Sequence, residues 1–217
     1  MRSEQRDAHQ VALGVIILAA GASSRMGRPK LLLPWGGTSV VGHLIAQWHS
    51  LGAAQVAVVG REGDESLHKE LDRLRFPQTG RIVNPQPERG MFSSILCAAN
   101  WIGWRTGLNA WALVLGDQPH LRDSTLRALL AFYLEHRRSI CQPDYAGRAR
   151  HPVILPKDAF AALSRSRAGT LREFLERSSD VSNKCSIDDP GLVLDLDRPE
   201  DYRNAQNIFT SNTCHPT

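Results

Sequence analysis

Short apolar runs alternate with segments of helical spacing along most of this chain, and this alternation restricts the possible folds more than any other feature. The runs at 15–19 and 110–115 contain only apolar residues. Unbroken apolar runs of this length are typical of strands that are buried on both faces of a sheet. Strands separated by helices form parallel sheets with right-handed crossovers. The sequence therefore predicts an α/β fold in one domain, with a mostly parallel central sheet.

The pattern also gives approximate positions for the elements. The expected strands are residues 15–19, 55–59, 81–84, 110–115, 139–142, 152–155, 181–187 and 192–194. The expected helices are residues 39–51, 65–74, 92–104, 124–137, 158–163 and 170–177, and a last helix begins after Pro199. Both ends of the chain lack such patterning. We therefore expect a disordered extension at residues 1–10, a folded domain at residues 11–205 and a flexible tail at residues 206–217.

Composition excludes several classes of protein. The 217 residues are 42% hydrophobic and 22% charged, as in ordinary globular proteins. The four cysteines form no C-x-x-C pair, so we expect reduced thiols and no structural zinc. No apolar run approaches the roughly 20 residues that span a bilayer. The arginines that contribute to the net charge of +4 are scattered rather than clustered. We therefore expect a cytoplasmic protein that binds neither membranes nor nucleic acid.

A loop rich in glycine and basic residues follows the first predicted strand. It contains Gly21, Arg25, Gly27 and Lys30. Glycines allow tight turns, and successive backbone N–H groups in such turns bind anions. Arginine can in addition bind two phosphate oxygens at once. The spacing matches neither a Walker loop nor a dinucleotide-binding G-x-G-x-x-G. It indicates a different kind of phosphate-binding loop.

Acidic residues lie at two further positions where a ligand would be expected. Asp117 directly follows the apolar run at 110–115, and ligands bind at the carboxyl ends of the strands in parallel α/β sheets. Mg²⁺ prefers one or two carboxylates together with phosphate oxygens and water, so we predict that Asp117 is a metal ligand. A second acidic stretch includes Asp195 and Asp197, and we expect Asp195 to point away from the site. Ser93 or Ser94 is expected to cap the helix that follows residues 81–84.

The segment from Leu18 to Lys30, L-A-A-G-x-S-x-R-M-G-x-x-K, resembles the signature of the MobA-like nucleotidyltransferases. Its double alanine resembles the molybdenum cofactor cytidylyltransferase branch, and the resemblance extends over roughly residues 11–207. It implies a Rossmann-like nucleotide-diphospho-sugar transferase fold. It also implies that Leu18, Ala19, Ala20 and Gly21 bind the nucleoside, while Arg25 and Lys30 bind the triphosphate.

The same resemblance assigns roles to later motifs. It places the Gly90–Met91 turn and Ser94 at the nucleotide, and it makes Asp117 and Asp197 the ligands of a Mg²⁺ cofactor. Arg150 and His151 correspond to a G-H-P motif that faces the acceptor substrate. This chain departs from that motif, because Arg150 replaces the usual glycine; the added side chain could bind an acceptor phosphate or narrow the pocket. Arg198 likewise replaces a usual threonine.

These features together indicate a magnesium-dependent nucleotidyltransferase in which Arg25, Lys30, Asp117 and Asp197 promote the reaction. The resemblance favours transfer of CMP from CTP to molybdopterin, with release of pyrophosphate, and a molybdoenzyme is a further candidate partner. Three alternatives stay open at this point. They are a sugar- or polyol-phosphate nucleotidyltransferase, a glycosyltransferase of related fold that uses Asp195-x-Asp197, and a non-catalytic protein that binds nucleotide or cofactor.

Overall fold

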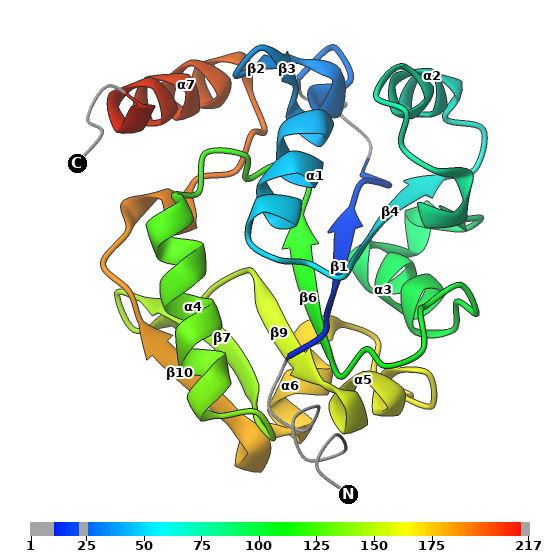
Figure 1. Cartoon of the computed structure of the whole chain (residues 1–217), viewed down its shortest axis with the longest axis vertical. Helices are drawn as coiled ribbons and strands as arrows, with labels where there is room; N and C mark the ends of the chain where they lie inside the picture. The colour runs from blue at the N-terminus through cyan, green and yellow to red at the C-terminus, as the bar shows by residue number, and fades with distance from the viewer. Residues whose placement is uncertain (1–10, 22–25, 214–217) are drawn as a thin grey trace, which may run out of the picture.

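The computed structural model describes residues 11–21 and 26–213, and it confirms the predicted α/β fold with a mostly parallel central sheet (Figure 1). The main sheet contains β1 (Leu13–Leu18), β4 (Gln55–Arg61), β5 (Arg81–Asn84), β6 (Ala110–Leu115), β7 (Ile140–Tyr145), β8 (Arg148–Ala149), β9 (Val153–Pro156) and β10 (Ser182–Ser186). The α-helices are α1 (Val40–Ser50), α2 (Glu65–Arg73), α3 (Met91–Ala99), α4 (Asp123–Glu135), α5 (Lys157–Leu163), α6 (Leu171–Arg177) and α7 (Pro199–Thr213). A short hairpin of β2 (Pro34–Trp35) and β3 (Thr38–Ser39) precedes α1.

The strand order is β10-β7-β9-β6-β1-β4-β5, and β8 pairs with β7 beside this path. β1 runs parallel to both β4 and β6, and β4 runs parallel to β5. β9 is antiparallel to its neighbours β6 and β7, which the sequence pattern did not predict. The carboxyl ends of β1, β4, β5 and β6 consequently lie at one edge of the sheet, which is the usual ligand edge of such folds.

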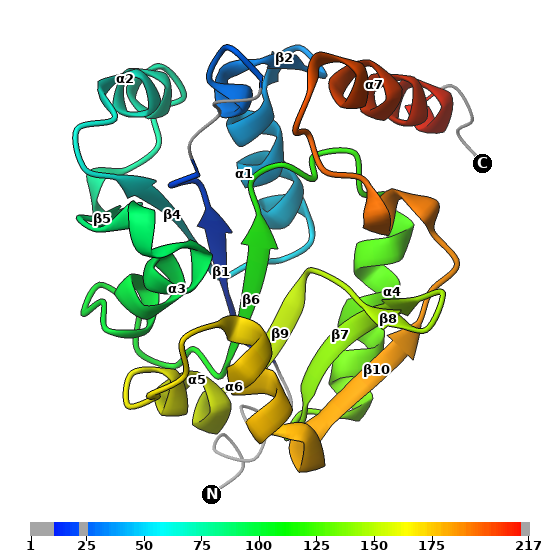
Figure 2. The ribbon, with the colours of Figure 1, turned by 180° about the vertical axis from the view of Figure 1, so that it is seen from behind.

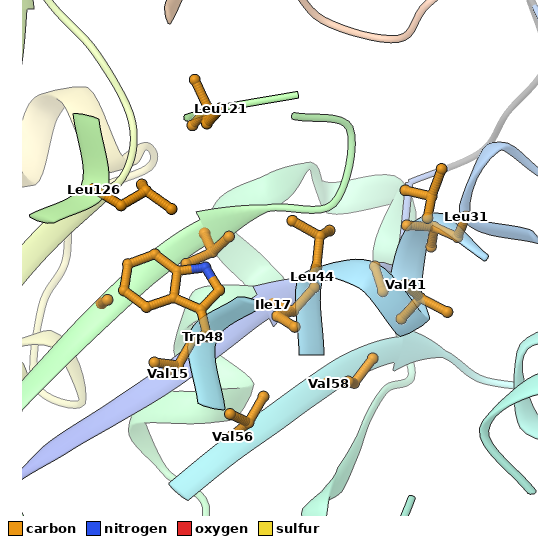
Figure 3. Packing of buried hydrophobic residues seen from close by; sticks show 14 of the residues in the cluster. Val15, Ile17, Leu31, Val41, Leu44, Trp48, Val56, Val58, Leu121 and Leu126 are labelled. Atoms are coloured by element: carbon orange, nitrogen blue, oxygen red, sulfur yellow. The ribbon is translucent and has the colours of Figure 1, made fainter. Parts of the chain in front are cut away.

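Helices cover both faces of the sheet and enclose a separate hydrophobic cluster on each side (Figures 1 and 2). Val15 and Ile17 belong to the cluster that contains α1 and α4 residues, and Ile16 belongs to the opposite cluster. This division follows from the alternation of side chains along a strand. Figure 3 shows Leu44 and Trp48 of α1 beside the strand residues of the first cluster. Burial of each such side chain stabilises the fold by about 1.5–3 kcal/mol.

Two elements differ from the sequence-based expectation. The helix expected at 92–104 ends at Ala99, and a turn follows in which the Trp104 indole N–H donates to the carbonyl of Ala98 at 2.8 Å. The strand expected at 192–194 is wrong. Residues Pro190–Val193 form a 3₁₀ turn, because Asp189 accepts a hydrogen bond from the backbone N–H of Gly191 and Pro190 favours a first helical position.

The C-terminal boundary also differs from the expected one. A tail was predicted from residue 206, but α7 continues to Thr213. Phe209 packs against Trp35 and His43, with ring centroids 5.2 and 5.1 Å apart. This tertiary contact keeps a polar segment helical although its own apolar pattern is weak. Residues 1–10, predicted to be a disordered extension, and residues 214–217 lie outside the described residues.

Across residues 11–21 and 26–213, no helix combines the length and the apolar character needed to cross a membrane. The cysteines in these ranges, Cys97, Cys141 and Cys185, are free.

Candidate functional site

A cavity of about 470 Å³ opens at the carboxyl edge of the sheet, where the segments after β1 and β6 meet the start of α3. Its lining includes nearly all residues that were predicted to bind nucleotide, namely Leu18, Ala19, Ala20, Gly21, Lys30, Gly90, Met91, Ser94 and Asp117. A second cavity of about 430 Å³ adjoins it, because both are lined by Ala19, Gly21, Leu31 and Arg61. Arg25 lies outside the described residues, so its role stays a prediction.

Close contact between β1 and β6 fixes the floor of the first cavity. The backbone N–H of Gly116 donates to the carbonyl of Leu18 at 3.1 Å, and the N–H of Ala19 donates to the carbonyl of Val59 at 2.9 Å. A Cβ atom on Gly116 would lie only 2.6 Å from the Leu18 oxygen. Glycine is therefore required immediately before Asp117 for the strands to approach this closely.

Lys30 brings the two predicted metal ligands together. Its Nζ atom lies 2.6 Å from Oδ2 of Asp117 and 3.6 Å from Oδ1 of Asp197. The other carboxylate oxygen of Asp117, Oδ1, is buried and has no hydrogen-bond partner within the described residues. A pair of carboxylates held around one cation, one of them with an unpartnered buried oxygen, fits the ligand preference of Mg²⁺.

The remaining ligands of such an ion would have to come from substrate and water. Over the described ranges there is no group of three or more His, Cys, Asp or Glu side chains arranged to hold a metal ion. Mg²⁺ is usually bound by one or two carboxylates plus phosphates and water.

Asp195 lies close to this pair, and the expectation that it points away is wrong. Its Oδ1 accepts a hydrogen bond from Gln118 Nε2 at 2.9 Å. Loss of hydration and the negative charge of Asp117 raise its pKa. Side chains two positions apart in an extended segment share a face, so the spacing of Asp195 and Asp197 could have revealed this proximity.

The start of α3 lines the same cavity as Asp117. The helix begins at Met91 after Gly90, whose φ of 86° favours glycine, and no side chain caps it, so the predicted serine cap is wrong. Ser93 and Ser94 instead accept hydrogen bonds from the Asn84 amide, at 2.8 and 2.9 Å. Asn84 ends β5 and thereby fixes the position of Ser94 at the cavity.

Arg150 and His151 line a different, larger cleft of about 890 Å³ between β8, β9, β10 and α6. Met91 lines both this cleft and the first cavity, so the two spaces adjoin there. The Nε atom of Arg150 is buried and has no hydrogen-bond partner within the described part of the chain. Burial lowers the pKa of His151, which favours its neutral imidazole, and its Nδ1 lies 3.5 Å from the carbonyl oxygen of Leu113. Arg148 and Lys184 add positive charge to the cleft.

Two residues at this edge were not predicted. Arg61 lines both nucleotide-side cavities and lies 3.5 Å from Asp64. Its position two residues after the predicted strand 55–59 was the available signal. His120 is buried, and its Nε2 lies 2.9 Å from the carbonyl oxygen of Gly191. No local pattern marked this contact, because its partner lies 71 residues away.

The chain is similar in sequence and in fold to known proteins. A model of the MobA-like NTP transferase domain matches residues 15–181. The molybdenum cofactor cytidylyltransferase of Escherichia coli (strain K12) is 27% identical over 203 residues, which cover 92% of this chain and 98% of that protein. The molybdenum cofactor guanylyltransferase of Rhodobacter capsulatus is 24% identical over 201 residues, covering 91% and 96% of the two chains.

Among solved structures, the manganese complex of Rv0371C from Mycobacterium tuberculosis H37Rv has the same fold, with a TM-score of 0.66 at 21% identity. The alignment covers 91% of this chain and 99% of that one. The family match covers most of the described chain and includes the loop after β1, α3 and Asp117. The predicted resemblance is thus confirmed, and the chain belongs to the MobA-like NTP transferase family, a family of nucleotidyltransferases.

Proposed function

We propose that this protein transfers CMP from CTP to the phosphate of a molybdopterin acceptor and releases pyrophosphate. The observation that carries the proposal is the meeting of two spaces at Met91. One is lined by the loop after β1 and by Asp117, and the other contains Arg150 and His151. A donor in the first and an acceptor in the second would place their reacting groups side by side.

The choice of donor and acceptor rests on relatives. The cytidylyltransferase of Escherichia coli aligns over nearly its whole length, which supports CTP and the molybdenum cofactor. The guanylyltransferase of Rhodobacter capsulatus aligns at 24% identity, against 27% for the cytidylyltransferase, which favours CTP over GTP as the donor.

The chemistry is an exchange of bonds at the α-phosphorus of the nucleotide. An oxygen of the acceptor phosphate attacks that phosphorus, the bond to the β-phosphate bridging oxygen breaks, and pyrophosphate leaves. The acceptor is already an anion, so no side-chain nucleophile is required. The protein's task is to position the two substrates and to neutralise their charge.

Each named residue has a part in this task. Asp117 and Asp197 would hold Mg²⁺, which would supply positive charge to neutralise the phosphates. Lys30, which lies between these carboxylates, would turn toward the triphosphate together with Arg25 and balance the charge of the leaving pyrophosphate. Arg150 offers its unpartnered buried N–H to an anionic acceptor. His151 as neutral imidazole would donate or accept a hydrogen bond without adding charge.

The test is calorimetric titration of CTP and GTP, with and without Mg²⁺, into the wild type and Asp117→Ala. We expect Mg²⁺-dependent CTP binding that weakens at least about tenfold in Asp117→Ala, because a charge-assisted contact contributes roughly 1.5–3 kcal/mol. Asp158→Ala is the matched control, since this exposed carboxylate lies in the first turn of α5, away from the site. Release of pyrophosphate on addition of molybdopterin then tests the acceptor.

The proposed donor, acceptor and metal site can each be refuted separately. Tighter binding of GTP than CTP would replace the proposed donor. Pyrophosphate release only with a sugar phosphate or polyol phosphate would replace the proposed acceptor. Normal turnover by Asp117→Ala would overturn the metal assignment.

A further inference from the structure

The two proposed metal ligands, Asp117 and Asp197, lie 80 positions apart in the chain. Specific contacts must therefore hold the segment that carries Asp197 beside Asp117. Asp197 belongs to no helix or strand. The segment that carries it leaves β10, passes beside the start of α4 and then enters α7 (Figure 2). An irregular segment depends on side-chain contacts for its position, because it lacks a regular ladder of backbone hydrogen bonds.

A buried polar cluster anchors this segment to α4. Asp189 is 2% exposed, and its Oδ2 accepts a hydrogen bond from the Thr125 hydroxyl at 2.5 Å. Its Oδ1 accepts from the backbone N–H of Gly191 at 2.9 Å. His120 completes the cluster: its Nε2 lies 2.9 Å from the Gly191 carbonyl oxygen, and a carbonyl only accepts, so Nε2 carries the proton. We call these residues, Asp189, Thr125, Gly191 and His120, the α4 latch.

The residues of the α4 latch are tightly packed around Gly191. A Cβ atom on Gly191 would lie 3.0 Å from Asp189 Oδ1 and 3.3 Å from His120 Cδ2. Burying a carboxylate is costly unless it is hydrogen-bonded, and both carboxylate oxygens of Asp189 accept hydrogen bonds within the latch. Burial also lowers the pKa of His120, which keeps the ring neutral and suited to its single donated bond.

Hydrogen bonds connect the α4 latch to the metal ligands. The N–H of Leu194 donates to the carbonyl of Gly191 at 3.1 Å, which continues the 3₁₀ turn. The N–H of Leu196, whose side chain is fully buried, then donates to the carbonyl of Asp117 at 3.1 Å. Asp195 and Asp197 flank this anchored residue. The latch and the Leu196–Asp117 bond thus hold residues 189–196 at both ends, and Asp197 directly follows this stretch.

We propose that Asp189 and Thr125 are positioning residues for metal binding, because the α4 latch sets where Asp197 lies relative to Asp117. This inference rests on the proposed metal role of the two carboxylates. Groups that orient metal ligands typically change metal affinity by about 10–100-fold when they are removed. A role confined to folding would change the unfolding temperature without changing metal affinity in the folded protein.

The experiment compares Thr125→Val, Thr125→Ser and Asp189→Asn with the wild type, and Ser124→Ala serves as an exposed control in the same helical turn. Affinity for Mn²⁺ in the presence of CTP is measured by electron paramagnetic resonance. Hydrogen–deuterium exchange at the amides of Leu194 and Leu196 is measured on the same samples.

We expect Thr125→Val to weaken Mn²⁺ binding by about 10–100-fold and to speed exchange at both amides. Thr125→Ser should restore both, since it keeps the hydroxyl. Asp189→Asn keeps an oxygen for Gly191 and is expected to lose less affinity than Thr125→Val. Unchanged Mn²⁺ affinity in Thr125→Val, with wild-type binding intact, would overturn the positioning role and leave the metal site standing. Failure of the wild type to bind Mn²⁺ would overturn the metal site and the positioning role together.

Discussion

Gly116 offers a direct test of how closely β1 and β6 must approach for the site to form. A Cβ atom at this position would lie 2.6 Å from the backbone oxygen of Leu18 and 2.8 Å from Cδ2 of Leu31. The Leu31 side chain can rotate away. The Leu18 oxygen cannot, because it accepts the hydrogen bond from Gly116 itself and Leu18 pairs with Leu115 in the ladder.

The magnitude for Gly116→Ala follows from this geometry. The 2.6 Å contact would have to lengthen to the 3.4 Å at which ordinary van der Waals contact begins. Overpacking of this kind typically costs about 1–3 kcal/mol of the free energy of unfolding. The same movement displaces Asp117, the next residue. Since a misplacement of about 1 Å at a reacting centre can cost on the order of 100-fold in rate, we expect turnover to fall by about that factor.

Urea unfolding measures the loss of stability in Gly116→Ala, and the rate of pyrophosphate release measures the loss of turnover. Gly169→Ala is the matched control, because its nearest atom would be the flexible Glu173 carboxylate at 3.6 Å, an ordinary contact. We expect this control to unfold within about 0.5 kcal/mol of the wild type and to keep its turnover. If Gly116→Ala also kept wild-type stability and turnover, the close approach of the strands would not be what positions Asp117.

Two further predictions concern stability away from the carboxylates. Burial lowers the pKa of His43, His120 and His151 from the ordinary value of 6.5, so the unfolded chain takes up protons before the folded protein does. Stability should therefore be greatest above pH 6.5 and fall as the pH decreases below it, by at most about 1.4 kcal/mol per pH unit for each histidine. Urea unfolding at pH 7.5 and 5.5 measures this, and His43→Gln should show a smaller loss; an equal or larger loss would contradict the assignment. Phe209→Ala should lower the free energy of unfolding by about 1–3 kcal/mol, because this half-buried ring packs on Trp35. Asn204→Ala, an exposed change in the same helix, should be neutral, and equal effects of the two variants would show that α7 is not held by Phe209.

The sheet and the loop after β1 could be predicted because their causes are local. Unbroken apolar runs at 15–19 and 110–115 require burial on both faces, and the residues that follow a parallel strand are bound to lie at its carboxyl edge. Asp117 was predicted from this rule, and Gly21 and Lys30 from the glycine- and base-rich loop after the first strand; the cavity at that edge is lined by all three.

Elements with weak patterns were predicted less well. The 3₁₀ turn at Pro190–Val193 contains apolar residues that suit a strand equally well, and the side chain of Asp189 decides between the two. The last turns of α7 are polar, and their helical state depends on the contact of Phe209 with Trp35 and His43. In α7 a tertiary contact thus overrides the weak preference of the segment itself.

The sequence by itself determined the fold class, the edge at which a ligand binds and the chemical types of side chain there, because periodicity and strand ends act over a few residues. Only the tertiary structure decided that Lys30 lies between Asp117 and Asp197 and that the α4 latch holds the segment that carries Asp197. Such contacts join residues more than 60 positions apart. They depend on how the whole chain closes and packs, and no local pattern contains that information.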